Sequence, residues 1–67
     1  MGEISIAAAR VNAGMTQKEL AEKLGVTPQA VYSWESGKAN MRPAYFYAIS
    51  LLTGVSVDNL ICPKGLK

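Results

Sequence analysis

The spacing of apolar residues predicts a short helix over residues 17–24. Leu20, Ala21 and Leu24 recur about one helical turn apart, so their side chains share one face of such a helix. Gly25 follows directly, and a glycine adopts the left-handed conformation of a helix end at little cost. Polar and charged residues occupy the remaining positions. The pattern therefore predicts a helix with one inward and one outward face.

Capping residues mark the start of this helix and of a second one. Thr16 and Glu19 are spaced so that each side chain can accept a hydrogen bond from the other residue's amide. Thr27 can cap a further helix over 28–36, and Pro28 would occupy its first position, where an N–H is not needed. Only a tight turn is left between the two helices.

The second helix has an inward face of its own. Val31 and Trp34 lie one turn apart, and the small Ala21 of the first helix allows the second to cross it closely. The apolar stripes leave three polar residues on the outward face, namely Gln29, Tyr32 and Ser33. These features predict a helix-turn-helix over residues 16–36, a motif that places its second helix in the major groove of DNA.

Apolar periodicity predicts three further helices, and hence a single all-α domain of five helices over residues 1–67. We expect the additional helices over residues 3–13, 43–53 and 57–61. The inward-facing residues expected on the first and fourth helices are Ile6, Ala9, Arg10, Ala13, Phe46, Ile49, Leu52 and Thr53. Tyr45 and Tyr47 cannot both face inward beside Phe46, so at least one of them is expected on the surface.

Composition narrows the possible chemistry. The chain has a net charge of +2 and no histidine. Its one cysteine, Cys62, has no partner for an internal disulfide, so we expect an inert thiol and a cytoplasmic protein. We expect no metal, no cofactor and no enzymatic activity, because no nucleophile is paired with a base. We expect no signal peptide, because the first segment lacks a basic start and a long apolar run, and no membrane span, because no window approaches the ~20 apolar residues that cross a bilayer. Lys38 and Arg42 give the acid-free segment 36–43 a local positive charge.

Individual residues resemble the Cro and cI-type repressor domains of phages, the XRE-like family. Within the helix-turn-helix, the residues similar to that family are Gln17, Leu20, Ala21, Leu24, Gly25, Val26, Val31, Trp34 and Glu35. The similarity continues at Arg10, Gly14, Gly37, Lys38, Pro43 and the segment TGVSVDNL over 53–60. It covers the chain from about Ile6 to Ile61.

The resemblance implies a compact, five-helix, lambda-repressor-like fold that binds double-stranded operator DNA sequence-specifically. The protein would be a prokaryotic or phage transcriptional regulator of the repressor type, with the helix over 28–36 in the major groove. Two alternatives remain. One is the antitoxin of a toxin–antitoxin pair, and the other is a protein-interaction module that has this fold without DNA activity, with a partner that the sequence does not identify.

Residues of the recognition helix are the candidates for reading bases. Gln29 can donate and accept hydrogen bonds at once, which suits the major-groove edge of adenine. Tyr32 and Ser33, one turn further on, can contact bases or phosphates, although Tyr32 can instead be partly buried against the preceding helix. Pro28 replaces the polar residue common in the family and can touch a thymine methyl or sugar, or only stiffen the helix start. The alternative for Gln29 is a solvated helix terminus.

A second group of residues is expected to hold phosphates. The resemblance implies that Gln17, at a helix N-terminus that attracts anions, clamps a backbone phosphate and braces Gln29. It also implies that the loop after the recognition helix follows the DNA backbone. The candidates in that loop are Lys38, Asn40 and Arg42. Such contacts govern affinity more than sequence preference, and a solvated loop is the alternative.

Arg10 stands out because it lies on the apolar face of the first helix, where an unpaired charge is costly. The resemblance implies that Arg10 pairs with Glu35 and fixes the recognition helix against the first helix. Arg10 is also a candidate for a phosphate contact.

Apolar residues near the C-terminus have two possible roles. Val57, Leu60 and Ile61 can close the core, or they can form the contact of a homodimer that reaches two half-sites on DNA. Asn59 occupies a position where the family often has an aromatic residue.

Overall fold

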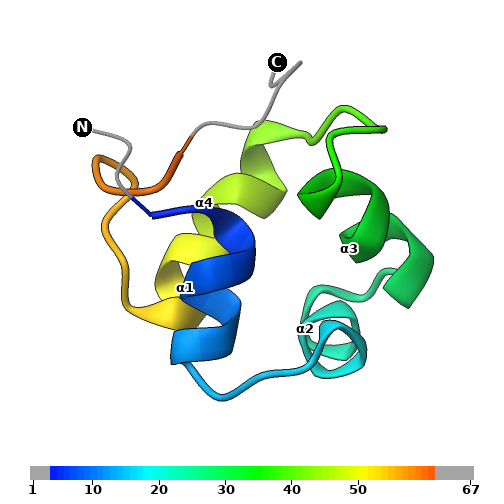
Figure 1. The fold of residues 1–67 in the computed structure, drawn as a ribbon, viewed down its shortest axis with the longest axis horizontal. Helices are drawn as coiled ribbons and strands as arrows, with labels where there is room; N and C mark the ends of the chain where they lie inside the picture. The colour runs from blue at the N-terminus through cyan, green and yellow to red at the C-terminus, as the bar shows by residue number, and fades with distance from the viewer. Residues whose placement is uncertain (1–3, 62–67) are drawn as a thin grey trace.

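In the computed structural model, which describes residues 4–61, the chain forms four α-helices joined by short loops (Figure 1). Their bounds are α1 Ile6–Asn12, α2 Gln17–Leu24, α3 Pro28–Glu35 and α4 Pro43–Thr53. The only extended pairing within residues 4–61 is an isolated parallel bridge between Ile4 and Leu60. The all-α fold is therefore confirmed, whereas the expected five helices are not found.

Local interactions account for the bounds of α2, which are those predicted. Thr16 Oγ1 accepts a hydrogen bond from the Glu19 amide at 3.0 Å, and the Thr16 amide donates to Glu19 Oε1 at 2.8 Å, as the capping box requires. These contacts with the Thr16 amide, and then with its side chain, lower the pKa of Glu19 below its ordinary value. The helix ends at Gly25, which has a left-handed φ of 73°. Both ends of α2 are thus set by residues next to it in sequence.

The first helix is shorter than predicted. Ser5 caps α1 by accepting a hydrogen bond from the Ala8 amide at 3.0 Å, so the helix begins at Ile6 rather than near Glu3, which lies outside the described residues. The helix ends at Asn12, and Ala13 is exposed instead of facing the core. The Ala13 amide still donates to the Ala9 carbonyl at 3.0 Å, so Ala13 caps the end of α1 with its side chain in solvent.

The expected helix over 57–61 does not form. Leu60 and Asn59 donate amide hydrogen bonds to the Ser56 carbonyl, which makes a single turn. The amide of Ile61 then donates to the Ile4 carbonyl at 2.8 Å, while the Ile4 amide donates to the Asn59 carbonyl at 2.9 Å. Pairing with Ile4 at the other end of the domain replaces further helical turns, which a five-residue segment would form only at a high nucleation cost.

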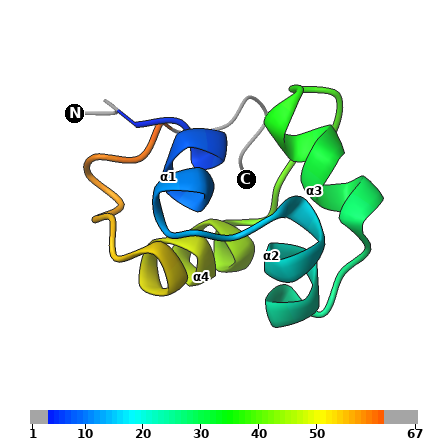
Figure 2. The same cartoon turned by 60° about the horizontal axis from the view of Figure 1, so that its bottom comes forward.

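The core lies where two helix pairs meet. α1 packs against α4, and α2 packs against α3 (Figures 1 and 2). The buried apolar residues are Ile6, Ala9, Leu20, Ala21, Val31, Trp34, Met41, Phe46, Ile49 and Leu60. Each large side chain among them contributes about 1.5–3 kcal/mol to folding by leaving water.

Two features of the core differ from expectation. Met41, in the loop before α4, is only 1% exposed, and helical periodicity gave no signal for it. Leu52 was expected to face inward but is 39% exposed, because Phe46 and Ile49 already form the inward face of α4. Thr53 is half-buried and donates its hydroxyl hydrogen to the Ile49 carbonyl at 2.7 Å.

No helix within residues 4–61 has the length and apolar character needed to cross a membrane.

Candidate nucleic-acid interface

The turn between α2 and α3 brings the two helices into close contact. Gly25 donates its amide hydrogen to the Glu22 carbonyl, and Val26 donates to the Ala21 carbonyl at 3.0 Å, which closes α2 and redirects the chain. Ala21 is completely buried. Thr27 then caps α3 by accepting from the Ala30 amide at 3.2 Å. The predicted helix-turn-helix geometry is therefore present, with α3 at one edge of the molecule in both views (Figures 1 and 2).

Helix α3 has two faces of different character. Val31 and Trp34 are buried, at 0% and 9% exposure, and Trp34 also packs on Tyr45 with ring centroids 5.2 Å apart. Pro28 and Gln29 are exposed on the opposite face. The outward position of Gln29 leaves its amide free to meet a partner in solution.

Tyr32 belongs to the exposed face as well. Its side chain is 46% exposed, which favours the outward role over burial against α2. Lys38 Nζ lies 5.8 Å from the centroid of the Tyr32 ring, a cation–π contact that links α3 to the loop after it. Ser33 is half-buried, and its carbonyl accepts the Lys38 amide at 2.9 Å. Ser33 is therefore less accessible than Tyr32.

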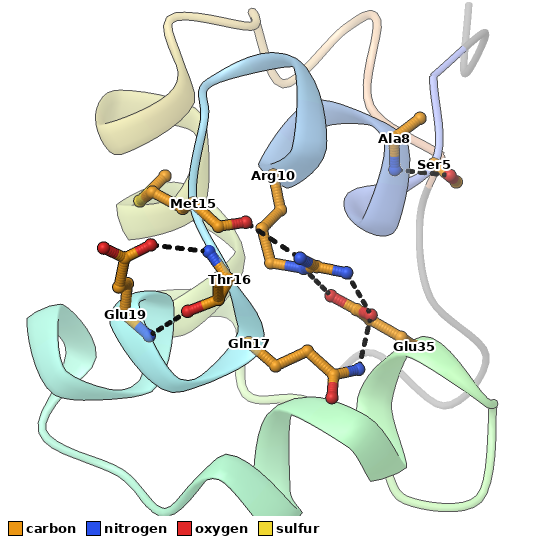
Figure 3. Close-up of polar contacts among 8 residues, drawn as sticks. All are labelled: Ser5, Ala8, Arg10, Met15, Thr16, Gln17, Glu19 and Glu35. Carbon is orange, nitrogen blue, oxygen red and sulfur yellow. Dashed lines mark hydrogen bonds and ion pairs between the residues drawn. The ribbon is translucent and has the colours of Figure 1, made fainter.

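The structure contains the Arg10–Glu35 ion pair that the resemblance implies (Figure 3). Arg10 Nε donates to Glu35 Oε2 at 2.7 Å, and Arg10 Nη2 donates to Glu35 Oε1 at 3.2 Å. Arg10 Nη1 donates to the Met15 carbonyl at 2.8 Å. The two charged side chains are only 13% and 8% exposed, so the pair joins α1, α3 and the loop before α2 in a largely buried site.

Gln17 joins this network, a contact that the sequence did not predict. Its Nε2 donates to Glu35 Oε1 at 2.9 Å (Figure 3). Gln17 also lines an open hollow of about 310 Å³ together with Pro28, Gln29 and Tyr32. The first residue of α2 therefore lies between the buried ion pair and the exposed face of α3.

A second, wider hollow of about 670 Å³ surrounds the N-terminus of α2. Gln17 and Lys18 of α2 line it together with Thr16, the residue that caps α2, and Arg10 and Pro28 line it from neighbouring helices. The free amides of a helix N-terminus favour an anion at such a place. Because three Arg10 nitrogens already donate to Glu35 and Met15, Arg10 is positioned mainly as a structural residue here.

The loop between α3 and α4 is held by its one buried side chain. Met41 inserts into the core, while Lys38, Asn40 and Arg42 are all exposed. Burial of Met41 fixes the loop against the domain and leaves the polar residues around it facing solvent. This anchor was missed because it lies outside any helical repeat.

The C-terminal candidates for a dimer contact differ in accessibility. Leu60 is only 2% exposed and packs in the core of its own chain, which favours the core-closing alternative for this residue. Val57 is half-buried against the core, and Ile61 is 45% exposed.

Helix α4 also has exposed apolar residues, since Tyr47 and Leu51 are 57% and 85% exposed. Of the pair Tyr45 and Tyr47, Tyr47 is therefore the one on the surface.

The helix-turn-helix family model HTH_3 matches residues 6–60 of the chain. This range includes all four helices and the Leu60 turn. The chain belongs to this helix-turn-helix family of the Cro and cI type. A helix-turn-helix domain of this family indicates a DNA-binding regulator of transcription, a class that is generally not enzymatic. No solved structure matched the chain.

Proposed function

We propose that the protein is a sequence-specific regulator of transcription, of prokaryotic or phage origin, that acts as a repressor by placing α3 in the major groove of operator DNA. The observation that carries this proposal is the division of α3 into two faces. Val31 and Trp34 are buried, whereas Gln29 and Tyr32 are exposed and adjacent. A helix held in this way presents polar side chains to the edges of base pairs.

Base reading is assigned to α3. Gln29 has an amide that can form two hydrogen bonds with adenine, and Tyr32 can pack on a thymine methyl or bond to a phosphate. Ser33 adds a hydroxyl at the edge of this face. Pro28 stiffens the start of the helix and can make only apolar contacts.

Phosphate binding is assigned to residues on either side of α3. Gln17 lies at the N-terminus of α2, and Lys38, Asn40 and Arg42 are exposed in the loop after α3. Lys38 and Arg42 are charged and would neutralise phosphates, which releases counterions, so affinity falls as the salt concentration rises. Gln17 and Asn40 are neutral and would donate hydrogen bonds to phosphate oxygens. Arg10 acts through the position of α3 rather than as a main phosphate ligand.

We further propose that the protein binds DNA as a homodimer. One domain carries one recognition helix and reads one half-site, and two-fold related half-sites lie about 34–36 Å apart along the duplex. Ile61 and Val57 are the candidates for the contact, since Leu60 is buried within its own chain.

Selection from random duplexes with the purified protein, at two salt concentrations, tests this function. We expect an enriched motif with two-fold symmetry and weaker binding at the higher salt concentration. Equal binding to all duplexes at low salt and high protein concentration would contradict the proposal.

One observation favours a second candidate, an antitoxin-like role in which the domain binds both DNA and another protein. Tyr47 and Leu51 form an exposed apolar face on α4, outside the helix-turn-helix. Replacing Leu51 with serine would weaken binding to such a partner and leave DNA selection unchanged. A protein-interaction module without DNA activity would give no enriched motif at all.

A further inference from the structure

The orientation of the Gln17 side-chain amide follows from its neighbour. Glu35 is a carboxylate and can only accept hydrogen bonds, so the amide nitrogen of Gln17 must face it. The Gln17 oxygen therefore points away from Glu35, and Figure 3 shows it on the side toward α3. A free glutamine amide can rotate to exchange its nitrogen and oxygen, but this one is held in a single orientation.

Glu35 is itself firmly held. Arg10 donates two hydrogen bonds to it, and the Glu35 side chain is only 8% exposed. Arg10 is anchored in turn by the carbonyl of Met15 at 2.8 Å. Gln17 is therefore oriented by a charged group that is itself held by Arg10.

The Gln17 oxygen can pair only with a hydrogen-bond donor. Phosphate oxygens are acceptors and cannot meet it, so a phosphate can use only the second hydrogen of the Gln17 nitrogen. Among the residues that line the same hollow, Pro28 has no donor. The side-chain donors there besides Gln17 itself are the Gln29 amide nitrogen and the Tyr32 hydroxyl.

We propose that Glu35 is a positioning residue for base reading, acting through Gln17 on Gln29. On DNA, the Gln29 nitrogen donates one hydrogen to the Gln17 oxygen and its other hydrogen to adenine N7. The Gln29 oxygen then accepts from the adenine N6 amino group. This inference rests on the proposed function, because it requires Gln29 to face a base pair.

Because the buried carboxylate of Glu35 can only accept hydrogen bonds, it determines which way the nitrogen and oxygen of the Gln29 amide face. With glutamine at position 35, an amide N–H can donate to the Gln17 oxygen instead, which turns the Gln17 nitrogen toward Gln29. Two amide nitrogens would then face each other, and the Gln29 amide would lose its fixed orientation.

The test measures binding of the selected duplex and of duplexes changed at one base pair each. Gln29→Ala identifies the base pair that Gln29 reads, where wild type should discriminate by roughly 5- to 150-fold. We expect Glu35→Gln and Gln17→Met to lower discrimination at that same base pair by about fivefold or more. Neither change should lower it further in the Gln29→Ala background.

Two variants separate positioning from loss of fold. Glu35→Gln weakens the pair with Arg10, but Gln17→Met leaves that pair intact and must show the same position-specific effect. Lys23→Met is the matched control, because Lys23 is exposed in the last turn of α2 and lies outside both hollows. Circular dichroism establishes that each variant is folded at the temperature of the assay.

The outcomes are distinct. The positioning role would be overturned if Gln17→Met lowered affinity equally for all duplexes. It would also be overturned if Gln17→Met lowered discrimination as much in the Gln29→Ala background as in wild type. Either result would leave the proposed function intact. No preference by wild type would overturn both. In the free protein, the Gln17 side-chain amide hydrogens should exchange with solvent more slowly than those of Gln29, and equal rates would also contradict the inference.

Discussion

Helices α3 and α4 bury their inward faces in the same way but leave very different outward faces. Each buries two residues three positions apart, Val31 and Trp34 in α3 and Phe46 and Ile49 in α4. The outward face of α3 is polar at Gln29, whereas α4 contains no charged residue and exposes Leu51. Core packing thus fixes the same spacing of buried residues in both helices, and the chemical character of their exposed residues is what differs.

The two helices are also held differently. Glu35 at the end of α3 is tied to Arg10 by an ion pair, so the placement of α3 depends on buried charge. Helix α4 is placed by apolar contacts and by the buried Met41 before it. A buried ion pair specifies geometry more surely than it adds stability, which suits a helix whose exact position decides what it can read.

The largest expected effect tests how α3 is held. Arg10→Ala should lower the free energy of unfolding by about 3–5 kcal/mol, because it leaves the carboxylate of Glu35 largely buried without its charged partner. Thermal melting followed by circular dichroism measures this effect. Arg42→Ala is the control, since Arg42 is exposed and should change stability by no more than about 0.5 kcal/mol. Equal melting temperatures for the two variants would contradict the role of the pair.

The next effect tests the polar face against the apolar one. Gln29→Ala should cost about 1–3 kcal/mol of binding free energy at one base pair of the site and little elsewhere, because the amide reads a single base. Tyr47→Ala, on the exposed face of α4, should leave base preference unchanged. Binding to duplexes substituted at each position measures both. Equal losses on all sequences for Gln29→Ala would remove it from base reading.

A smaller effect concerns the loop that follows α3. Lys38→Ala should weaken binding evenly across sequences and reduce the slope of log affinity against log salt by about one unit, because one fewer counterion is released. Affinity measured at several salt concentrations gives the slope. An unchanged slope would remove Lys38 from the residues that bind phosphate.

The smallest effect concerns the cap of α2, on which Gln17 sits. The folded-state pKa of Glu19 is lowered by its contacts with Thr16, so its charge stabilises the fold above the unfolded-state pKa. This stabilisation is lost as the pH falls through the folded-state value. Glu19→Gln should therefore lower the melting temperature slightly at neutral pH and make no difference near about pH 2. A difference that persists in acid would point to another cause.

Local signals explain why α2 could be predicted from sequence alone. Its capping box, apolar stripe and terminal glycine all lie within residues 16–25, and the structure keeps those bounds. The inward places of Val31 and Trp34 on α3 follow from the same kind of short-range pattern. The polar outward face of the candidate site was therefore predictable as well.

Features that depend on distant parts of the chain could not be predicted in this way. The segment 57–61 is extended at its end because Ile4 pairs with it, and Met41 packs in a core formed by residues distant from it in sequence. The hydrogen bond from Gln17 to Glu35 depends on how α2 and α3 cross. The Arg10–Glu35 pair was expected only through resemblance to a family, since spacing alone does not bring the two residues together.

The pairing of Ile4 with Leu60 and Ile61 fastens the two ends of the domain like a clasp. This pairing closes a loop that runs from one end of residues 4–61 to the other, so forming it before the rest of the fold would carry a high entropy cost. We expect it to form last during folding and to open first during native-state fluctuations. The amide hydrogens of Ile4 and Ile61 should then exchange with deuterium before those of α2 and α3. The helix-turn-helix would thus remain folded when the pairing between the two ends of the domain has opened.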